Sequence, residues 1–251
     1  MSVNILGHIF EQSISDLEEL RKEYIEEEKT TVSKRKKDGI FYTPEYIVDY
    51  IVRNSLGKYL EEKFEELGKE HKNEFKLHQA YQATLQNIKV LDPACGSGAF
   101  LVKVFDFLLE ENKRVIDVLA GGNTGMFDSY QMAKGILQNN IYGVDLNNES
   151  VEITKLSLWL KTAEKGQKLA TLDENIKCGN SLIDDKEVAG DKAFVWEEEF
   201  AEIMGNGGFD VVVGNPPYVY TRNINKKEKD FYSVFETSEY QNDLYILFIE
   251  R

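Results

Sequence analysis

The stretch KVLDPACGSGAFLVKVFDF, residues 89–107, decides the fold class. Apolar residues within 88–91 predict a short strand, and the spacing of apolar residues from 99 to about 113 predicts a helix. The DPACGSG segment between them predicts a tight loop, because glycine accepts backbone conformations that other residues avoid. A strand that turns directly into a helix is the first half of a strand–helix–strand unit.

Further strands and helices alternate after this unit. NIYGVDL at 140–146, a segment ending near Cys178 and FDVVV at 209–213 predict three more strands. Helical periodicity is found at 129–138 and at 149–166. Strands that alternate with helices form parallel sheets joined by right-handed crossovers. The sequence therefore predicts an α/β fold.

The N-terminal part has a different pattern. Apolar residues three or four apart at 5–28 predict an amphipathic helix, and a polar, basic segment follows at 30–39. A second helix is expected to begin at Pro44, with Thr43 as its N-cap. Gly57 is expected to interrupt or end that helix.

Composition narrows the functional class. The hydrophobic content of 42% fits a globular protein with a substantial core. The net charge of −14 argues against the whole chain being a nucleic-acid clamp, because phosphate binding needs a basic surface. Cys95, Cys178 and three scattered histidines show no metal-ligand spacing, so we expect no metal site and a reducing, cytoplasmic compartment. No apolar run approaches the roughly 18 residues of a membrane span, and no secretory signal is recognisable.

Ligands of open parallel sheets bind beyond the carboxyl ends of the strands, and two predicted strands end there in candidate ligand-binding residues. Gly96 and Gly98 would allow close approach to the backbone at a helix N-terminus, and Asp92 could accept a hydrogen bond from a ligand ammonium. Asp145, at the end of the next strand, could accept both hydroxyls of a ribose. Each feature alone is equally compatible with an ordinary turn.

The last two strand ends carry amides. Asn180 could recognise a purine edge, although alone it is no more specific than any turn asparagine. Asn215 and the carbonyl of Pro216 could accept both hydrogens of one exocyclic amine, leaving the nitrogen lone pair free. Tyr218 could stack on the ring that carries the amine, and Pro216 and Pro217 would hold this corner rigid.

These motifs together resemble a known family. NPPY at 215–218 and DPACGSGAF at 92–100 resemble motifs of S-adenosylmethionine-dependent adenine-N6 DNA methyltransferases. FYTP at 41–44 precedes both, and this order resembles the gamma group, found in type I and fused type IIG restriction–modification enzymes. The resemblance covers about residues 40–251.

The resemblance implies S-adenosylmethionine as the cofactor, with no metal. Asp145 would bind its ribose hydroxyls, Leu146 would lie against its adenine, and Asn180 would contact its amino group where many members carry Asp. Tyr42 and Thr43 would form a lid over it, and the DPACGSG loop would surround its methionine moiety. The cofactor-binding residues implied are Tyr42, Thr43, Asp92, Ala94, Gly96, Gly98, Asp145, Leu146, Asn180 and Asn215.

The resemblance also implies the reaction. Asn215, Pro216, Pro217 and Tyr218 would hold a flipped target adenine, and adenine N6 would attack the sulfonium methyl group directly. Rival interpretations are a protein-glutamine or RNA methyltransferase, since these also use an Asn-Pro-Pro-aromatic corner, or a non-catalytic cofactor-binding fragment. FYTP ahead of the glycine loop favours DNA.

The family's Rossmann-like class I sheet has seven strands, of which four are recognisable. We therefore expect residues 40–251 to be the N-terminal part of a catalytic domain in a longer parent enzyme, preceded by a helical extension and linker at 1–39. The full-length parent enzyme would bind double-stranded DNA. Within this chain, phosphate contacts or simple solvation are both open for Arg222, Lys226, Lys227 and Lys229. The apolar strand at 209–213 would then be an exposed sheet edge that favours self-association.

Overall fold

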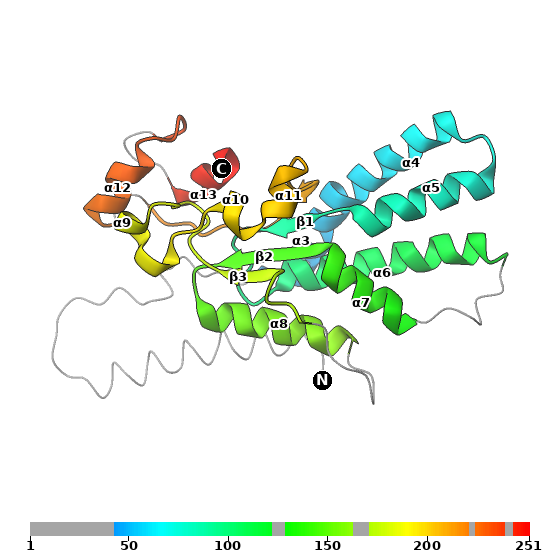
Figure 1. The fold of residues 1–251 in the computed structure, drawn as a ribbon, viewed down its shortest axis with the longest axis horizontal. Helices are drawn as coiled ribbons and strands as arrows, with labels where there is room; N and C mark the ends of the chain where they lie inside the picture. Colours follow the sequence, from blue (N-terminus) through cyan, green and yellow to red (C-terminus); the bar gives the residue numbers. More distant parts are fainter. Residues whose placement is uncertain (1–42, 122–128, 163–170, 221–223, 239–242) are drawn as a thin grey trace.

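A computed structural model describes residues 43–121, 129–162, 171–220, 224–238 and 243–251. Its centre is a parallel sheet with strand order β3-β2-β1-β4 (Figure 1). The parallel sheet confirms the predicted α/β, Rossmann-like class. The strands are β1 Val90–Asp92, β2 Ile141–Asp145, β3 Ile176–Cys178 and β4 Val211–Val212.

Helices cover both faces of the sheet. α6 Ala99–Leu119, α7 Ser129–Asn139 and α8 Asn148–Thr162 lie on one face, and α10 Trp196–Glu199 and α11 Ala201–Gly205 lie on the other (Figure 1). Successive strand residues point to opposite faces. The two cores that result contain Val90, Ile141, Ile176 and Val211 on the α6 side, and Leu91, Tyr142, Val144 and Phe200 on the other.

The strands begin at positions fixed by polar side chains. The amide of Asn140 donates to the carbonyl of Ile88 at 2.8 Å, and the amide of Asn175 donates to the carbonyl of Ile141 at 3.0 Å. Asp210 accepts the backbone N–H that directly precedes β1, at 2.7 Å. Each polar residue ahead of one strand therefore holds the start of its neighbour, which sets the register of the sheet.

One long helical segment precedes the sheet. α3 Glu45–Val52, the π-helical turn η1 Arg53–Gly57 and α4 Lys58–Glu70 follow one another directly. The predicted interruption at Gly57 is therefore a π-turn, and the helix continues beyond it. A Cβ at Gly57 would lie 3.3 Å from the Phe107 ring, so glycine lets α6 pack closely there.

The structure of this region differs from the sequence analysis at a helix start and in an additional helix. Pro44, not Thr43, is the N-cap of α3, and no side chain caps the helix, because the Thr43 hydroxyl bonds elsewhere. α5 Glu74–Asn87 was not predicted, since its apolar stripe is weak. It is capped by Asn73, whose side chain accepts from the N–H of Lys76, and it pairs with α4 as a projecting hairpin (Figure 1).

The C-terminal segments pack together beside the sheet. They comprise α9 Lys186–Ala189, the 3-10 turn η2 Gly190–Lys192, α12 Lys226–Tyr232 and α13 Leu244–Glu250. Their shared core contains Leu182, Ile183, Tyr232, Phe235 and Leu247. Lys226, Lys227 and Lys229 lie on α12.

The predicted N-terminal helix at 5–28 and linker at 30–39 lie outside the described residues, as do Tyr42 and Arg222. Among the helices that are described, none is long and apolar enough to cross a bilayer.

Candidate active site

The carboxyl ends of the strands bring the predicted residues to one edge of the sheet. Asp92 and Asp145 are the last residues of β1 and β2, and Asn180 and Asn215 follow β3 and β4 by two and three positions. Since all strand pairs are parallel, these positions face the same edge.

The glycine loop connects β1 to α6. Gly96 and Gly98 have φ values of +52° and +86°, a region that favours glycine. The Gly96 N–H donates to Asp145 Oδ2 at 2.8 Å, and the Gly96 carbonyl accepts from the Thr154 hydroxyl at 2.8 Å. A Cβ at Gly98 would lie 2.9 Å from Thr154, whereas a Cβ at Gly96 would meet nothing within 4 Å. The loop is thus held by α8 and open above Gly96.

Asp145 supports the loop from β2. Its Oδ1 accepts the N–H of Asn147 at 2.8 Å, so each carboxylate oxygen holds one backbone N–H. A carboxylate oxygen can accept a second hydrogen bond, which leaves Asp145 able to bind hydroxyl groups. The side chain of the adjacent Leu146 is 53% exposed.

Asp92 lies beneath the loop. It is 1% exposed, its Oδ1 accepts the N–H of Ala94 at 3.1 Å, and a Cβ on Gly214 would lie 2.5 Å from that oxygen. Burial, together with the smaller effect of the Asp145 charge, raises the pKa of Asp92 to about 8, although the Ala94 hydrogen bond acts to lower it. Asp92 therefore links the glycine loop to the residue that precedes Asn215.

The Asn-Pro-Pro-Tyr corner follows β4. The Asn215 amide donates from Nδ2 to Thr43 Oγ1 at 3.1 Å, which joins this corner to the beginning of α3. The Tyr218 ring is 50% exposed and lies 5.4 Å, centroid to centroid, from the ring of Tyr245 at an angle of 44°. The N–H of Leu244 donates to the carbonyl of Val219 at 2.9 Å, so α13 begins against the corner.

Asn180 is part of a turn. Its Oδ1 accepts the N–H of Leu182 at 3.1 Å, and its side chain also bonds the Tyr232 hydroxyl. Burial raises the pKa of Tyr232, and the Asn180 bond opposes that rise. The neighbouring Ser181 hydroxyl donates to the Pro93 carbonyl at 2.5 Å and ties this turn to the glycine loop. Contact between Asn180 and a cofactor stays a prediction.

Several residues at this edge were not expected from the sequence. Thr154 and Ser181 brace the glycine loop, and Gly214 makes room for Asp92. Tyr245 contacts Tyr218, and Asp243 carries a buried Oδ1 that finds no hydrogen-bond partner within the described part of the chain. Only Gly214 had a sequence signal, as a small residue between an apolar strand and the corner. Over the same described ranges, no group of three or more His, Cys, Asp or Glu side chains could hold a metal ion.

The sequence is similar to those of known proteins. Residues 139–251 match the family described as Eco57I restriction-modification methylase. The chain is 31% identical over 279 residues to the type II restriction enzyme and methyltransferase RM.Eco57I of Escherichia coli, covering 100% of this chain and 25% of that protein. It is 27% identical over 211 residues to the adenine-specific methyltransferase PglX of Streptomyces coelicolor, covering 74% of this chain and 15% of that protein.

A solved structure shows the same fold. The type IIL restriction-modification enzyme MmeI in complex with DNA superposes with a TM-score of 0.58 at 20% identity, over 87% of this chain and 29% of that one. The chain spans a quarter or less of the length of the curated relatives it matches. Its residues 139–251, which contain β2, β3 and β4, therefore match the Eco57I restriction-modification methylase family.

Proposed function

We propose that this protein transfers a methyl group from S-adenosylmethionine to N6 of a flipped adenine in double-stranded DNA, as part of a restriction–modification enzyme. Adenine as the target base is supported by the relative named as an adenine-specific methyltransferase. The role in restriction–modification is supported by the relative named as a restriction enzyme and methyltransferase. Residues 40–251 would form the N-terminal part of the catalytic domain. The reaction would take place in the cytoplasm, where the free thiols of Cys95 and Cys178 stay reduced.

The residues at the sheet edge fit this cofactor. A Cβ at Gly96 would meet nothing within 4 Å, so a ligand could approach the backbone there, and α6 begins three residues later with N–H groups suited to a carboxylate. Asp92 and Ala94 would complete the surroundings of the amino-acid end. Asp145 would accept the ribose hydroxyls, while the exposed Leu146 would cover the adenine. When bound, S-adenosylmethionine supplies an electrophilic methyl group on a sulfonium.

The corner after β4 would bind the target amine. Asn215 Oδ1 and the Pro216 carbonyl would each accept one hydrogen of adenine N6, which directs the nitrogen lone pair away from both acceptors. Tyr218 would stack on the base, an interaction worth about 1–3 kcal/mol for bases on aromatic side chains. Pro216 and Pro217 restrict the corner, so little entropy is lost when the base arrives.

One observation carries this proposal. The Asn-Pro-Pro-Tyr corner is joined to the glycine loop through the contact between Gly214 and Asp92, and to α3 through the bond between Asn215 and Thr43. An amine-binding corner that adjoins a cofactor-type loop is the arrangement that methyl transfer between two bound ligands requires.

The experiment is methyl transfer from labelled S-adenosylmethionine to three acceptors: unmethylated double-stranded DNA, unmodified tRNA and a peptide-release factor. We expect label in DNA alone, with N6-methyladenine as the product nucleoside after digestion. Label in tRNA or in a glutamine side chain would replace the proposal with one of its rivals. Cofactor binding measured by calorimetry, without transfer to any acceptor, would support the non-catalytic interpretation.

DNA contact would involve α12. Lys226, Lys227 and Lys229 are exposed, and no ion pair between described residues includes them. Neutralising phosphates through such side chains makes affinity depend on salt. Replacing all three with glutamine should therefore weaken DNA binding and reduce its salt dependence.

A further inference from the structure

We propose that Thr43 is a positioning residue that fixes the orientation of the Asn215 amide. The two residues are 172 positions apart in the sequence, yet Asn215 Nδ2 donates to Thr43 Oγ1 at 3.1 Å. The family resemblance implies a role for Thr43 at the cofactor. In the structure, Thr43 instead contacts Asn215, the residue that would bind the target amine. The effect of Thr43 on catalysis therefore rests on the proposed function.

The orientation of this amide matters because its two ends are chemically opposite. Oδ1 accepts hydrogen bonds and Nδ2 donates them, and a half-turn of the amide exchanges their places. A target amine offers hydrogens, so it needs the oxygen. With Nδ2 bound to the Thr43 hydroxyl, Oδ1 is left for the amine. The hydroxyl could hold the reversed amide only by donating its own proton to Oδ1, and that orientation would turn the Nδ2 donor toward the hydrogens of the amine.

Thr43 is itself held in place. Pro44 restricts the backbone of the residue before it, and the Pro44 carbonyl accepts the N–H of Ile47 and of Val48 at 2.9 and 3.1 Å. α3 is anchored to the core by Val48 and Val52, which are 3% and 0% exposed.

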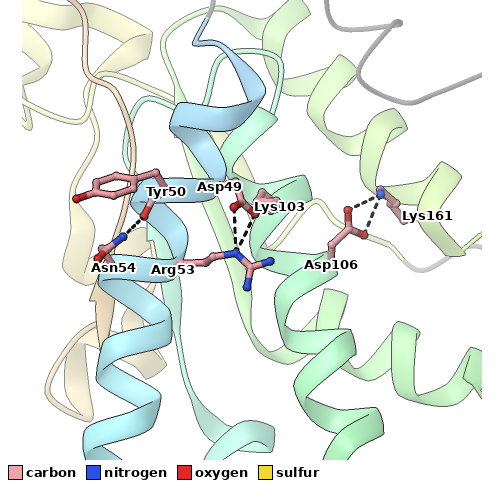
Figure 2. Close-up of polar contacts among 7 residues, drawn as sticks. All are labelled: Asp49, Tyr50, Arg53, Asn54, Lys103, Asp106 and Lys161. Atoms are coloured by element: carbon pink, nitrogen blue, oxygen red, sulfur yellow. Dashed lines mark hydrogen bonds and ion pairs between the residues drawn. The ribbon is translucent and has the colours of Figure 1, made fainter.

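Ion pairs on the outer side of α3 add a second anchor. Asp49 pairs with Lys103 of α6 at 2.5 Å and with Arg53 at 3.0 Å, and α6 is joined to α8 by Lys161 and Asp106 at 2.7 Å (Figure 2). These two hydrogen-bonded partners, Lys103 first, lower the pKa of Asp49. These ion pairs hold α3, which begins two residues after Thr43, against the helices that cover this face of the sheet.

The backbone of Asn215 is equally constrained. Gly214 is packed against the buried Asp92, and Pro216 and Pro217 restrict the other side. Side-chain rotation is then the main freedom that remains to Asn215, and the bond to Thr43 restricts it.

Two variants separate positioning from other roles. Thr43→Val keeps the shape of the side chain and removes the hydroxyl, whereas Thr43→Ser keeps the hydroxyl. Thr84→Val on the distant α5 is the matched control, because the Thr84 hydroxyl donates to the Ala80 carbonyl of its own helix, at 3.5 Å.

The first readout does not depend on activity. In protein labelled with nitrogen-15 at asparagine, the Asn215 side-chain signal is assigned by its loss in Asn215→Ala. We expect its order parameter to fall to below about 0.6, the flexible range, in Thr43→Val and to stay high in Thr43→Ser and Thr84→Val. An unchanged order parameter and chemical shift in Thr43→Val would overturn the proposal.

The second readout is single-turnover methyl transfer together with the cofactor dissociation constant. Thr43→Val should slow transfer by about 10- to 100-fold, the range expected for loss of a hydrogen bond at a reacting group, while cofactor affinity changes less than about threefold. Thr43→Ser should restore the rate. Weakened cofactor binding with a normal rate would make Thr43 a cofactor residue and overturn the proposal. Absence of N6-methyladenine with the wild-type protein would instead refute the proposed function and leave the first readout to decide on Thr43.

Discussion

Replacing Asp92 with asparagine should make the protein more stable at neutral pH. The buried carboxyl has a pKa of about 8 instead of the usual 3.8, because burial disfavours its charge. Between these values the native state holds a proton that the unfolded state has released. The folded protein therefore loses stability as the pH rises from about 4 to 8. Asparagine carries no titrating proton, and its carbonyl oxygen can still accept the N–H of Ala94.

The size of the effect follows from the shift. Each unit of pKa difference corresponds to about 1.4 kcal/mol, so Asp92 should destabilise the native state by about 2 kcal/mol at pH 5 and about 4 kcal/mol at pH 7. The contributions of the other titrating groups to the free energy of unfolding cancel when wild type and Asp92→Asn are compared. The difference between their free energies of unfolding should then change by about 3 kcal/mol between these pH values, with the variant favoured at pH 7.

Urea unfolding at pH 5, 6 and 7 measures this difference. Asp117→Asn, an exposed substitution on α6, is the matched control and should show no comparable pH dependence. If the gap between wild type and Asp92→Asn were the same at all three pH values, Asp92 would be ionised in the native state. Its burial against Gly214 would then have to be compensated by a charge partner, and the reasoning would be wrong.

Three further predictions test the remaining contacts. Gly214→Ala should destabilise the protein by about 1–3 kcal/mol, because its Cβ would press on Asp92. The control Gly135→Ala, in the open middle of α7, should stabilise the protein by about 0.5–1 kcal/mol. Equal melting temperatures of the two variants would contradict this. Asp145→Ala should weaken binding of S-adenosylhomocysteine by about tenfold or more in calorimetry, and an unchanged dissociation constant would remove Asp145 from the site. Val212→Lys should reduce concentration-dependent light scattering, because Val212 is 58% exposed on the edge strand β4; wild type that stays monomeric at high concentration would exclude self-association through this edge.

The sheet and its corners could be predicted because their signals are local. Apolar runs that end in Asp92, Asp145 or Asn215 mark strands and their carboxyl ends, and Gly96 and Gly98 mark the loop that needs positive φ. Because the strands are parallel, their carboxyl ends lie at the same edge of the sheet, so no long-range contact had to be predicted to bring these residues together.

The contacts between corners could not be predicted in the same way. Thr43 was expected to be a helix N-cap, because a hydroxyl directly before Pro44 can cap a helix that begins there. It was also expected to contact the cofactor, because it belongs to the FYTP motif. Its bond to Asn215 depends on how α3 packs against the sheet, and no pattern within either segment encodes it. α5 was missed for a related reason: its residues gain burial from α4 and α6 rather than from a clear stripe of their own.

The most direct test of the account is methyl transfer by Asn215→Ala, with cofactor affinity measured on the same preparation. If Asn215 Oδ1 accepts a hydrogen of the target amine, transfer should fall by about 100-fold or more while the cofactor dissociation constant changes less than about threefold. A normal transfer rate in this variant would contradict the assignment of the Asn-Pro-Pro-Tyr corner as the site that binds the adenine.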